Sequence, residues 1–401
     1  MQMKKGILVR LMAMMFIQMM TFPVWFTTLA KFVGERPGWN TLLYSMLMGI
    51  GMFASPIVCM FADRFLDSGK VLALCNLVAA AALGGAFYAN DSFITLSMLL
   101  LVATVALMPT WSLVSAVAMT HASQSSFPYI RALGSIGWAA SAIFSIVAIK
   151  CFGFTDFEKS PWIFACGAFV AFAGFLTALI QPATPPSAKG SKMSVVDALG
   201  LRAFVLLKER SVLILSATLL LSMVAFQWYF YYNSQYLSDA GWNMTTAVIN
   251  IGTLVELGFM VALPWIIKRL GFKGSTLLGF AALAFRYGAF YLAVKTGCHL
   301  LDFGGIMIHG LIFGILIVGI QMHMAEIAPA ELRNQAQGFV MLLTAGIGYF
   351  LSVGLFRVVL KASEVMPGVI DWTIPFMTAF AIAAAAFVLF ALFYRSPARK
   401  S

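Results

Sequence analysis

The sequence predicts an all-α membrane protein made of two bundles of six transmembrane helices, and three observations predict this fold class. First, 61% of the 401 residues are hydrophobic and 10% are charged, and the mean hydropathy is +0.92, which no soluble globular domain needs. Second, apolar runs of about 20 residues, enough to cross a hydrocarbon core of about 30 Å as a helix, recur along the chain. Third, one long polar interruption lies near the middle.

The apolar runs predict twelve helices separated by short polar clusters. They cover residues 10–32, 41–61, 71–89, 93–120, 130–150, 161–181, 212–235, 246–267, 275–295, 302–324, 337–360 and 371–394. The first run is too long for a removable signal peptide and lacks a small-residue cleavage site, so we expect it to remain as the first helix.

The distribution of Lys and Arg predicts the orientation, because cytoplasmic loops carry the excess of both. With both termini in the cytoplasm, most of the 26 Lys and Arg residues fall in cytoplasmic segments. The formal net charge of +11 then reflects the membrane topology, and we do not expect the protein to bind nucleic acid. The five cysteines are scattered, without the spacing of a metal site or a disulfide framework, and we expect neither a metal nor a cofactor.

The central polar interruption begins with "QPATPPSAKG" and continues with "SVVDALGLRAFVLLKER". Its start is typical of a linker, and the second stretch has the spacing of an amphipathic helix that lies on the inner membrane surface. We therefore expect an N-terminal six-helix bundle over residues 1–181, a cytoplasmic linker with an amphipathic helix over 182–211, and a C-terminal six-helix bundle over 212–401.

Both halves contain a proline-containing helix end followed by a tight basic loop, at residues 56–70 and 264–275. The first of these loops, "ADRFLDSGK", and the twelve spans make the chain resemble the major facilitator superfamily, which carries a G-x-x-x-D-R-x-G signature there. Asp63 and Arg64 match the signature, and Cys59 stands where its leading glycine is expected. The resemblance implies the pseudo-symmetric major facilitator fold and a gating loop at Asp63 and Arg64.

Six stretches in both halves make the chain resemble, more narrowly, the bacterial nucleoside/proton symporter family. They are "WFTTL" (25–29), "MPTWSLVSA" (108–116), "FPYIRALGSIGW" (127–138), "LGLRAFVLLKER" (199–210), "RNQAQGFVMLLTAGIG" (333–348) and "IDW" (370–372). The resemblance implies a multi-pass transporter of the bacterial inner membrane that imports nucleosides by proton symport, with two halves that rock about a central site. We expect a monomer whose partners are a small-molecule substrate, protons and the lipid bilayer.

Glu256 interrupts the apolar stretch "TLVELGFMVALPWII" at residues 253–267. A carboxylate at mid-bilayer costs about 2.5–3.5 kcal/mol on insertion scales, so it persists mainly where it faces the bundle interior or water. Glu256 is therefore a candidate to bind a proton on one side of the membrane and release it on the other. Arg286, which also lies in mid-span, is a further candidate for proton coupling, and the alternative is that it forms a structural ion pair with Glu256. Thr253 shares the helix face of Glu256 and suits substrate recognition, or else bonds to its own backbone.

His309 lies inside the tenth predicted span. The ordinary pKa of a histidine, about 6.5, suits proton coupling, and the alternative is a neutral imidazole bonded across helices. By resemblance, Glu256 stands at the position of a substrate-binding acidic residue of the family, and Gln227 at that of a substrate-binding glutamine. His309 stands at the position of an aromatic residue that lines the substrate pocket. The family carries an aspartate five residues after the His309 position, where this chain has Gly314. Either Glu256 and His309 perform the coupling, or the substrate and the driving ion, with sodium as one option, differ from the family pattern.

Arg131 and Trp138 in the fifth predicted helix are seven residues apart, two turns or about 10 Å along one face. Gly134 and Gly137 make this part of the helix thin, so a neighbour or a ligand can approach closely; the alternative is helix packing with a snorkelling arginine. The nucleoside-family resemblance assigns Arg131, Ser135 and Trp138 to the substrate pocket. R-x-x-G-x-x-G-W also resembles the fifth helix of lactose permease, where Arg and Trp hold a sugar ring. The alternative function is therefore a proton-coupled sugar or oligosaccharide symporter of the same superfamily.

Three residues of the first helix, Gln18, Trp25 and Thr28, match family positions that face the cavity. The alternative is ordinary hydrogen bonding and packing between helices. The aromatic residues at 228–236 favour an aromatic belt at the outer interface.

Catalytic motifs of membrane-embedded enzymes are missing from the sequence. It contains no H-E-x-x-H, no G-x-S-x-G and no acidic metal cluster. We therefore expect a transporter and not an enzyme.

Overall fold

The computed structural model describes residues 5–34, 36, 39, 41–123, 125–155, 157–190, 202–242, 245–366 and 369–395. Within these residues, ten helices are long and apolar enough to cross a membrane. A two-stranded antiparallel hairpin, β1 (Glu364–Met366) and β2 (Val369–Ile370), pairs Glu364 with Ile370 and Met366 with Val369. The prediction of an all-helical membrane protein is confirmed.

The chain divides into two compact units. The first comprises Met1–Ala203 and Ile327–Leu342, and the second comprises Phe204–Glu326 and Leu343–Ser401. The division near residue 203 lies inside the linker predicted over 182–211. The first part of the amphipathic helix predicted over residues 194–210 lies outside the described residues, and its second part forms the 3-10 helix η2 (Arg202–Lys208).

The first unit is built from helices of varied length, several of which divide a predicted span into two. They are α1 (Lys5–Thr21), α2 (Pro23–Gly34), α3 (Thr41–Met52), α4 (Ser55–Arg64), α5 (Ser68–Tyr88), α6 (Phe93–His121), α7 (Phe127–Ala140), α8 (Ile143–Phe152), η1 (Phe157–Lys159), α9 (Trp162–Leu179) and α16 (Arg333–Met341), the last preceded by η4 (Ala330–Leu332). α2 begins at Pro23, where the missing N–H and the ring end α1. α4 has Pro56 in its first turn, a position that tolerates proline.

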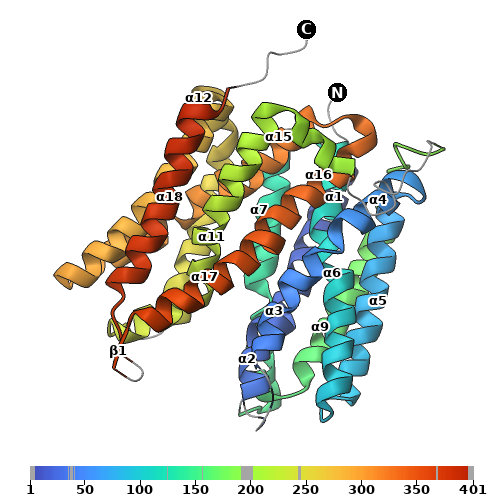
Figure 1. Ribbon diagram of the computed structural model, residues 1–401. Helices are drawn as coiled ribbons and strands as arrows, with labels where there is room; N and C mark the ends of the chain where they lie inside the picture. Colours follow the sequence, from blue (N-terminus) through green and yellow to red (C-terminus); the bar gives the residue numbers. More distant parts are fainter. Residues whose placement is uncertain are drawn as a thin grey trace. The chain divides into compact units, whose positions relative to one another are not determined.

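Close helix packing in the first unit depends on small residues. Among the helices of this unit (Figure 1), α5 packs against α6 and α9, and α1 packs against α7 and α9. A Cβ on Gly137 would overlap the backbone carbonyl of Phe16, so only a glycine allows α7 to lie this close to α1. A Cβ on Gly174 would lie 2.8 Å from Oδ1 of Asn76, which shows the same close approach of α9 to α5.

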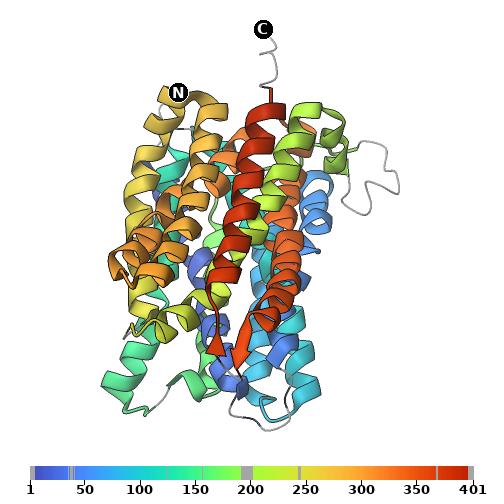
Figure 2. The same ribbon diagram turned by 60° about the vertical axis from the view of Figure 1, so that its left-hand side comes forward.

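The second unit is built from long helices and two π-helical segments. In chain order they are η2 (Arg202–Lys208), α11 (Arg210–Asp239), α12 (Thr245–Thr296), α13 (His299–Met307), α14 (His309–Phe313), the π-helix η3 (Gly314–Gly319), α15 (Ile320–Ile327), the π-helix η5 (Leu342–Ile347), α17 (Gly348–Ala362) and α18 (Thr373–Phe393). α18 packs against both α11 and α12 (Figure 2).

α12 consists of two helices that meet at Gly271 and cover the eighth and ninth predicted spans. Gly271 has a non-helical backbone with φ 66° and ψ 175°, a region open essentially to glycine, so the chain leaves the helical path there. Beside this break, Nζ of Lys273 donates to the carbonyl oxygens of Ala391 at 3.1 Å and Tyr394 at 2.8 Å. A cation at the C-terminal end of α18 also offsets the helix dipole.

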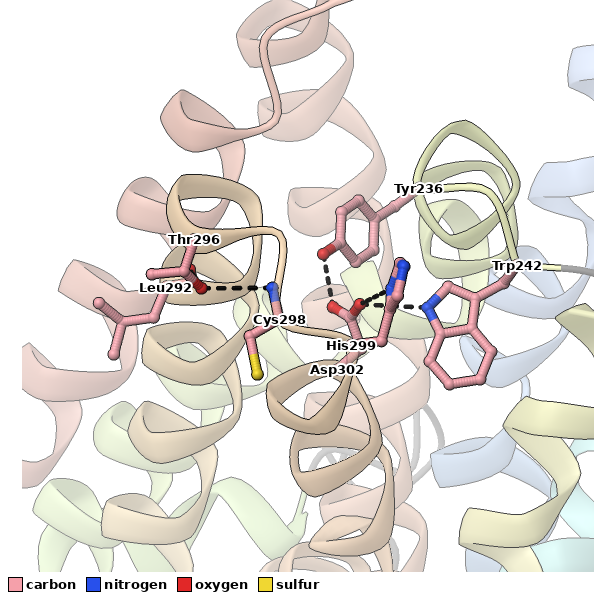
Figure 3. Close-up of polar contacts among 7 residues, drawn as sticks. All are labelled: Tyr236, Trp242, Leu292, Thr296, Cys298, His299 and Asp302. Atoms are coloured by element: carbon pink, nitrogen blue, oxygen red, sulfur yellow. Dashed lines mark hydrogen bonds and ion pairs between the residues drawn. The ribbon is translucent and has the colours of Figure 1, made fainter.

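A buried carboxylate joins the end of α11 to the first turn of α13 (Figure 3). Asp302 accepts hydrogen bonds from Oη of Tyr236 at 2.5 Å and Nε1 of Trp242 at 3.1 Å, and Nδ1 of His299 lies 3.3 Å from it. Hydrogen bonds to an ionised acceptor are stronger than neutral ones. This cluster therefore fixes where α13 starts relative to α11.

α12 and α13–α14 touch backbone to backbone near Glu256. A Cβ on Gly310 would lie 2.5 Å from Cα of Glu256, and a Cβ on Gly252 would lie 2.9 Å from the carbonyl oxygen of Ile306. Contacts this short exclude any side chain at either glycine unless the helices separate. The two glycines therefore set the distance between these helices.

We predict that Gly310→Val destabilises the protein by about 1–3 kcal/mol, the cost of overpacking a close contact. Its Cβ would collide with the backbone of Glu256, which no rotamer change relieves. The measurement is the thermal unfolding midpoint of the purified protein in detergent. Gly304→Ala is the matched control, because a Cβ there meets nothing within 4 Å; equal midpoints for the two variants would contradict the prediction.

Candidate substrate and proton site

Three ionisable side chains meet inside the second unit. Glu256 and Arg286 lie on α12, on opposite sides of the break at Gly271, and His309 is the first residue of α14. Nδ1 of His309 is 2.9 Å from Nη2 of Arg286, and Nε2 of His309 is 4.0 Å from Oε2 of Glu256. The three residues are 4%, 0% and 3% exposed in the order Glu256, Arg286 and His309. The imidazole thus lies between a buried carboxylate and a buried guanidinium.

Arg286 is held by groups from three elements. Its Nε donates to the carbonyl oxygen of Gly305 at 3.1 Å, and its Cζ lies 4.2 Å from the centroid of the Tyr229 ring, a cation–π contact that gains strength when water is excluded. Its Nη1 is buried and has no hydrogen-bond partner among the described residues. The guanidinium therefore keeps one donor available for a ligand atom or a water.

The imidazole of His309 is enclosed by aromatic rings of α11. It stacks on Phe226, with centroids 5.8 Å apart and an interplanar angle of 16°, and on Tyr229, at 5.2 Å and 23°. Phe230 meets it edge to face at 5.6 Å. These rings fix the plane of the imidazole, and aromatic pairs in such geometries contribute beyond their burial.

The expectation of an aromatic belt is wrong for three residues of α11. Trp228, Tyr229 and Tyr236 are each at most 2% exposed, because they lie on faces of α11 that pack against other helices and not at a lipid interface. Tyr229 is the site residue that the belt interpretation missed. The i, i+3, i+4 spacing of Phe226, Tyr229 and Phe230 was the available signal, since it places all three on one helix face.

The other predicted residues of the second unit lie around this cluster. Nε2 of Gln227 donates to the carbonyl oxygen of Thr344 in η5 at 3.2 Å. Thr253 is half-buried, one turn before Glu256. Gly314 begins η3, and a Cβ there would meet only Cε of Met260, at 3.9 Å, so the position has room for a side chain that the chain does not supply.

The three candidate residues of the first helix make their contacts within the first unit. Gln18 donates from Nε2 to Oγ1 of Thr110 at 2.6 Å and accepts from Nδ2 of Asn76 at 2.7 Å. Trp25 is fully buried and meets the ring of Phe22 edge to face. Oγ1 of Thr28 donates to the carbonyl oxygen of Trp25 at 3.1 Å. Both ends of the Gln18 amide therefore have partners on α5 and α6.

The fifth-helix candidates lie on α7. Arg131 and Ser135 are buried, and a Cβ on Gly134 would lie 2.7 Å from Nη1 of Arg131, so the guanidinium extends over that glycine. A snorkelling arginine would be exposed, and Arg131 is not. Trp138 is half-buried and meets Trp111 edge to face at 6.1 Å.

The predicted gating loop contacts the start of α16. Asp63 is fully buried and accepts hydrogen bonds from Nδ2 of Asn334 at 2.6 Å, from the backbone N–H of Asn334 at 3.3 Å and from that of Gln335 at 3.0 Å. A carboxylate at a helix N-terminus is favoured by the dipole and by the unpaired N–H groups. Burial raises the pKa of the Asp63 carboxyl to about 6, although these hydrogen bonds act to lower it. Arg64 is also buried.

No group of three or more His, Cys, Asp or Glu side chains in the described part of the chain could hold a metal ion. The predicted site residues form separate groups: Glu256, Arg286 and His309 with Tyr229 in the second unit, and Gln18, Arg131 and Asp63 with their partners in the first. Within its own unit, each group is buried and hydrogen-bonded.

Comparison with known proteins identifies the chain at the level of family. The family model described as "Nucleoside H+ symporter" matches residues 5–399. The chain is 30% identical to the "Putative nucleoside transporter YegT" of Escherichia coli (strain K12), over 88% of this chain and 84% of the relative. It is 26% identical to the "Xanthosine permease" of the same organism, over 92% and 91%.

The fold has a match among solved structures. The crystal structure of the nucleoside transporter NupG covers 98% of this chain and all of that chain, with a TM-score of 0.66 and 20% sequence identity. At this identity the likeness concerns the fold alone. The match of the family model over nearly the whole chain and the likeness to YegT show that this protein is a transporter and not an enzyme, and that it belongs to the nucleoside H+ symporter family.

Proposed function

We propose that this protein imports nucleosides together with protons by alternating access, with Glu256 as the residue that carries the proton. The observation that carries the proposal is the burial of Glu256 in an apolar helix, 4.0 Å from an imidazole that contacts a buried guanidinium. A carboxylate in such a place is costly and marks an ion or substrate pathway. Membership of the family makes the protein a multi-pass nucleoside/proton symporter of the inner membrane.

Glu256 is better suited than Arg286 to bind and release the transported proton. A guanidinium stays protonated in proteins, so Arg286 cannot release a proton. When Glu256 is ionised, Arg286 offsets its charge through His309, and when Glu256 is protonated, Arg286 keeps its contacts with Gly305 and Tyr229. Both protonation states are therefore compatible with the same surroundings.

For the nucleoside we propose two groups of contacts. In the second unit these are Gln227, Thr253, Glu256 and His309. In the first unit they are Arg131, Ser135 and Trp138, where an indole can stack on a nucleobase and a guanidinium can donate to hydroxyl groups. Gln18, Trp25 and Thr28 complete the group in the first unit, with Gln18 acting through its bonds to Thr110 and Asn76.

Nucleosides are favoured over the sugar alternative. The named relatives are a putative nucleoside transporter and a xanthosine permease, and both cover most of this chain. The R-x-x-G-x-x-G-W pattern on α7 resembled a sugar site, but its glycines are used for packing: Gly137 lies against Phe16 of α1. The pattern therefore does not by itself indicate a sugar.

We also propose the full count of twelve membrane helices, with both termini in the cytoplasm. Two observations support this count over the ten long apolar helices. α3 and α4 together cover the predicted second span but are each too short to be counted, and α12 covers two predicted spans joined at Gly271. The excess of Lys and Arg in the predicted cytoplasmic segments supports the orientation.

We predict that membrane vesicles containing the protein accumulate labelled uridine and adenosine when the outside is more acidic than the inside. A labelled disaccharide should not accumulate, and a sodium gradient alone should drive no uptake. Vesicles without the protein are the control. Gradient-driven accumulation of the disaccharide without that of either nucleoside would contradict the proposed substrate class.

We predict that Glu256→Gln abolishes accumulation of nucleoside against its gradient while exchange of internal for external nucleoside continues. The amide keeps the shape and the hydrogen-bonding capacity of the side chain but cannot exchange a proton. The measurement is uptake and exchange in proteoliposomes with an imposed pH gradient. Glu326→Gln, at an exposed glutamate, is the matched control and should behave as the wild type. A Glu256→Gln protein with undiminished accumulation would remove this residue from the coupling role.

We propose that Asp63 and Arg64 belong to a gate, and we predict that Asp63→Asn slows nucleoside uptake about tenfold, the equivalent of 1.4 kcal/mol, with little change in nucleoside affinity. An amide accepts fewer and weaker hydrogen bonds from the start of α16 than a carboxylate does. The measurements are initial uptake rates and equilibrium binding. Asp91→Asn, at an exposed aspartate, is the matched control and should take up nucleoside at the wild-type rate. Equal rates for the two variants would argue against the gate.

A further inference from the structure

We infer that Arg286 is a positioning residue that holds His309 as the neutral tautomer with its proton on Nε2, directed toward Glu256. The tautomer follows from the geometry of the second unit alone. Its consequence for transport rests on the proposed function: His309 acts as a fixed donor, and Glu256 is the one member of the cluster that exchanges a proton.

The tautomer follows from the chemistry of the 2.9 Å contact between Nη2 of Arg286 and Nδ1 of His309. A guanidinium has five N–H donors and no acceptor, so Nη2 donates and Nδ1 accepts with its lone pair. A neutral imidazole carries a single N–H, and in this case it must be on Nε2. That nitrogen is the one that lies 4.0 Å from Oε2 of Glu256.

The orientation of both partners is fixed independently of this contact. The guanidinium is held by the carbonyl oxygen of Gly305 and by the face of Tyr229. The plane of the imidazole is held by its stacking on Phe226 and on Tyr229. Turning the ring over would present a carbon atom to Nη2 and leave that donor buried without an acceptor, which costs free energy.

Charge opposes protonation of His309 in this arrangement. A second proton would have to go on Nδ1, where it would face the N–H of Arg286 and place two positive groups in contact in an apolar surrounding. The groups that face the imidazole from α11 are Phe226, Tyr229 and Phe230, all uncharged rings. From α12 they are Arg286 and Glu256. Protonating Glu256 instead adds no cation beside Arg286.

The separation of 4.0 Å between Nε2 and Oε2 is longer than a hydrogen bond. A small rotation of the Glu256 side chain or a bridging water closes this distance. We therefore assign to His309 the role of stabilising the ionised carboxylate by donation, which favours release of the proton from Glu256. Arg286 acts in this step only through the imidazole.

The test is ¹⁵N NMR of protein labelled at its four histidines, with His309→Gln used to assign the His309 signals. Between about pH 5 and 8, the range in which an ordinary histidine titrates, Nε2 of His309 should remain protonated and Nδ1 should remain bare. A wild-type spectrum with the proton on Nδ1, or with both nitrogens protonated in this range, would overturn the inference.

Two variants test whether the donor-only chemistry of Arg286 selects the tautomer. Arg286→Lys keeps a group that can only donate, and the proton of His309 should stay on Nε2. Arg286→Gln supplies an amide that can also accept, so the tautomer with the proton on Nδ1 should become populated. Identical tautomer populations in the wild type and Arg286→Gln would show that Arg286 does not hold the proton on Nε2.

A transport experiment tests the consequence separately. His309→Gln places an N–H donor near the Nε2 position, and His309→Asn places an acceptor near the Nδ1 position. Proton-driven nucleoside accumulation should be retained better in His309→Gln than in His309→Asn. The reverse order would refute the role of His309 as a donor toward Glu256, even if the NMR result holds. Unchanged accumulation in Glu256→Gln would refute the proposed function but would leave the inferred tautomer of His309 unaffected.

Discussion

The second unit depends on keeping a carboxylate and a guanidinium together in its buried interior. Each charge alone would be too costly to bury. Glu256 and Arg286 do not touch directly; His309 lies between them and is polar at both ends. The carbonyl of Gly305 and the ring of Tyr229 then take up further contacts of the guanidinium. Under the proposed function, the carboxylate changes its charge while the guanidinium keeps these contacts.

The backbone of the second unit is shaped to make this contact possible. Gly310 and Gly252 bring α14 and α12 together at the level of Glu256, and the break at Gly271 separates the helix that carries Glu256 from the helix that carries Arg286. The bonds between Asp302, Tyr236 and Trp242 fix the start of α13, the helix that leads to His309. The position of the imidazole is therefore determined from both ends of α13 and not by the polar contacts alone.

Much of the architecture was predictable from the sequence, because membrane spans follow from hydropathy and the ionisable residues inside them are few. Glu256, Arg286 and His309 were candidates on residue type and depth alone, and the structure shows that they form one cluster. The family and the nucleoside substrate class are confirmed by the comparisons. The substrate contacts and the coupling role stay predictions.

Other features depend on contacts between distant segments, which local patterns do not encode. The partners of Gln18 on α5 and α6 are 58 and 92 residues away along the chain, and the grouping of residues 327–342 with the first unit has no sequence signal. The role of Tyr229 was missed because an aromatic residue near a helix end fits a lipid interface and a packed core equally well by hydropathy. Only the packing of neighbouring helices around the residue distinguishes a lipid interface from a packed core.

The central claim is that Glu256 is the group that gains and loses the transported proton, and infrared difference spectroscopy across a pH jump tests it most directly. The protein in membranes should show the carbonyl band of a protonated carboxylic acid when the pH is lowered, and this band should be missing from the Glu256→Gln protein. If the band is the same in both proteins, another group carries the proton and the account of this site is wrong.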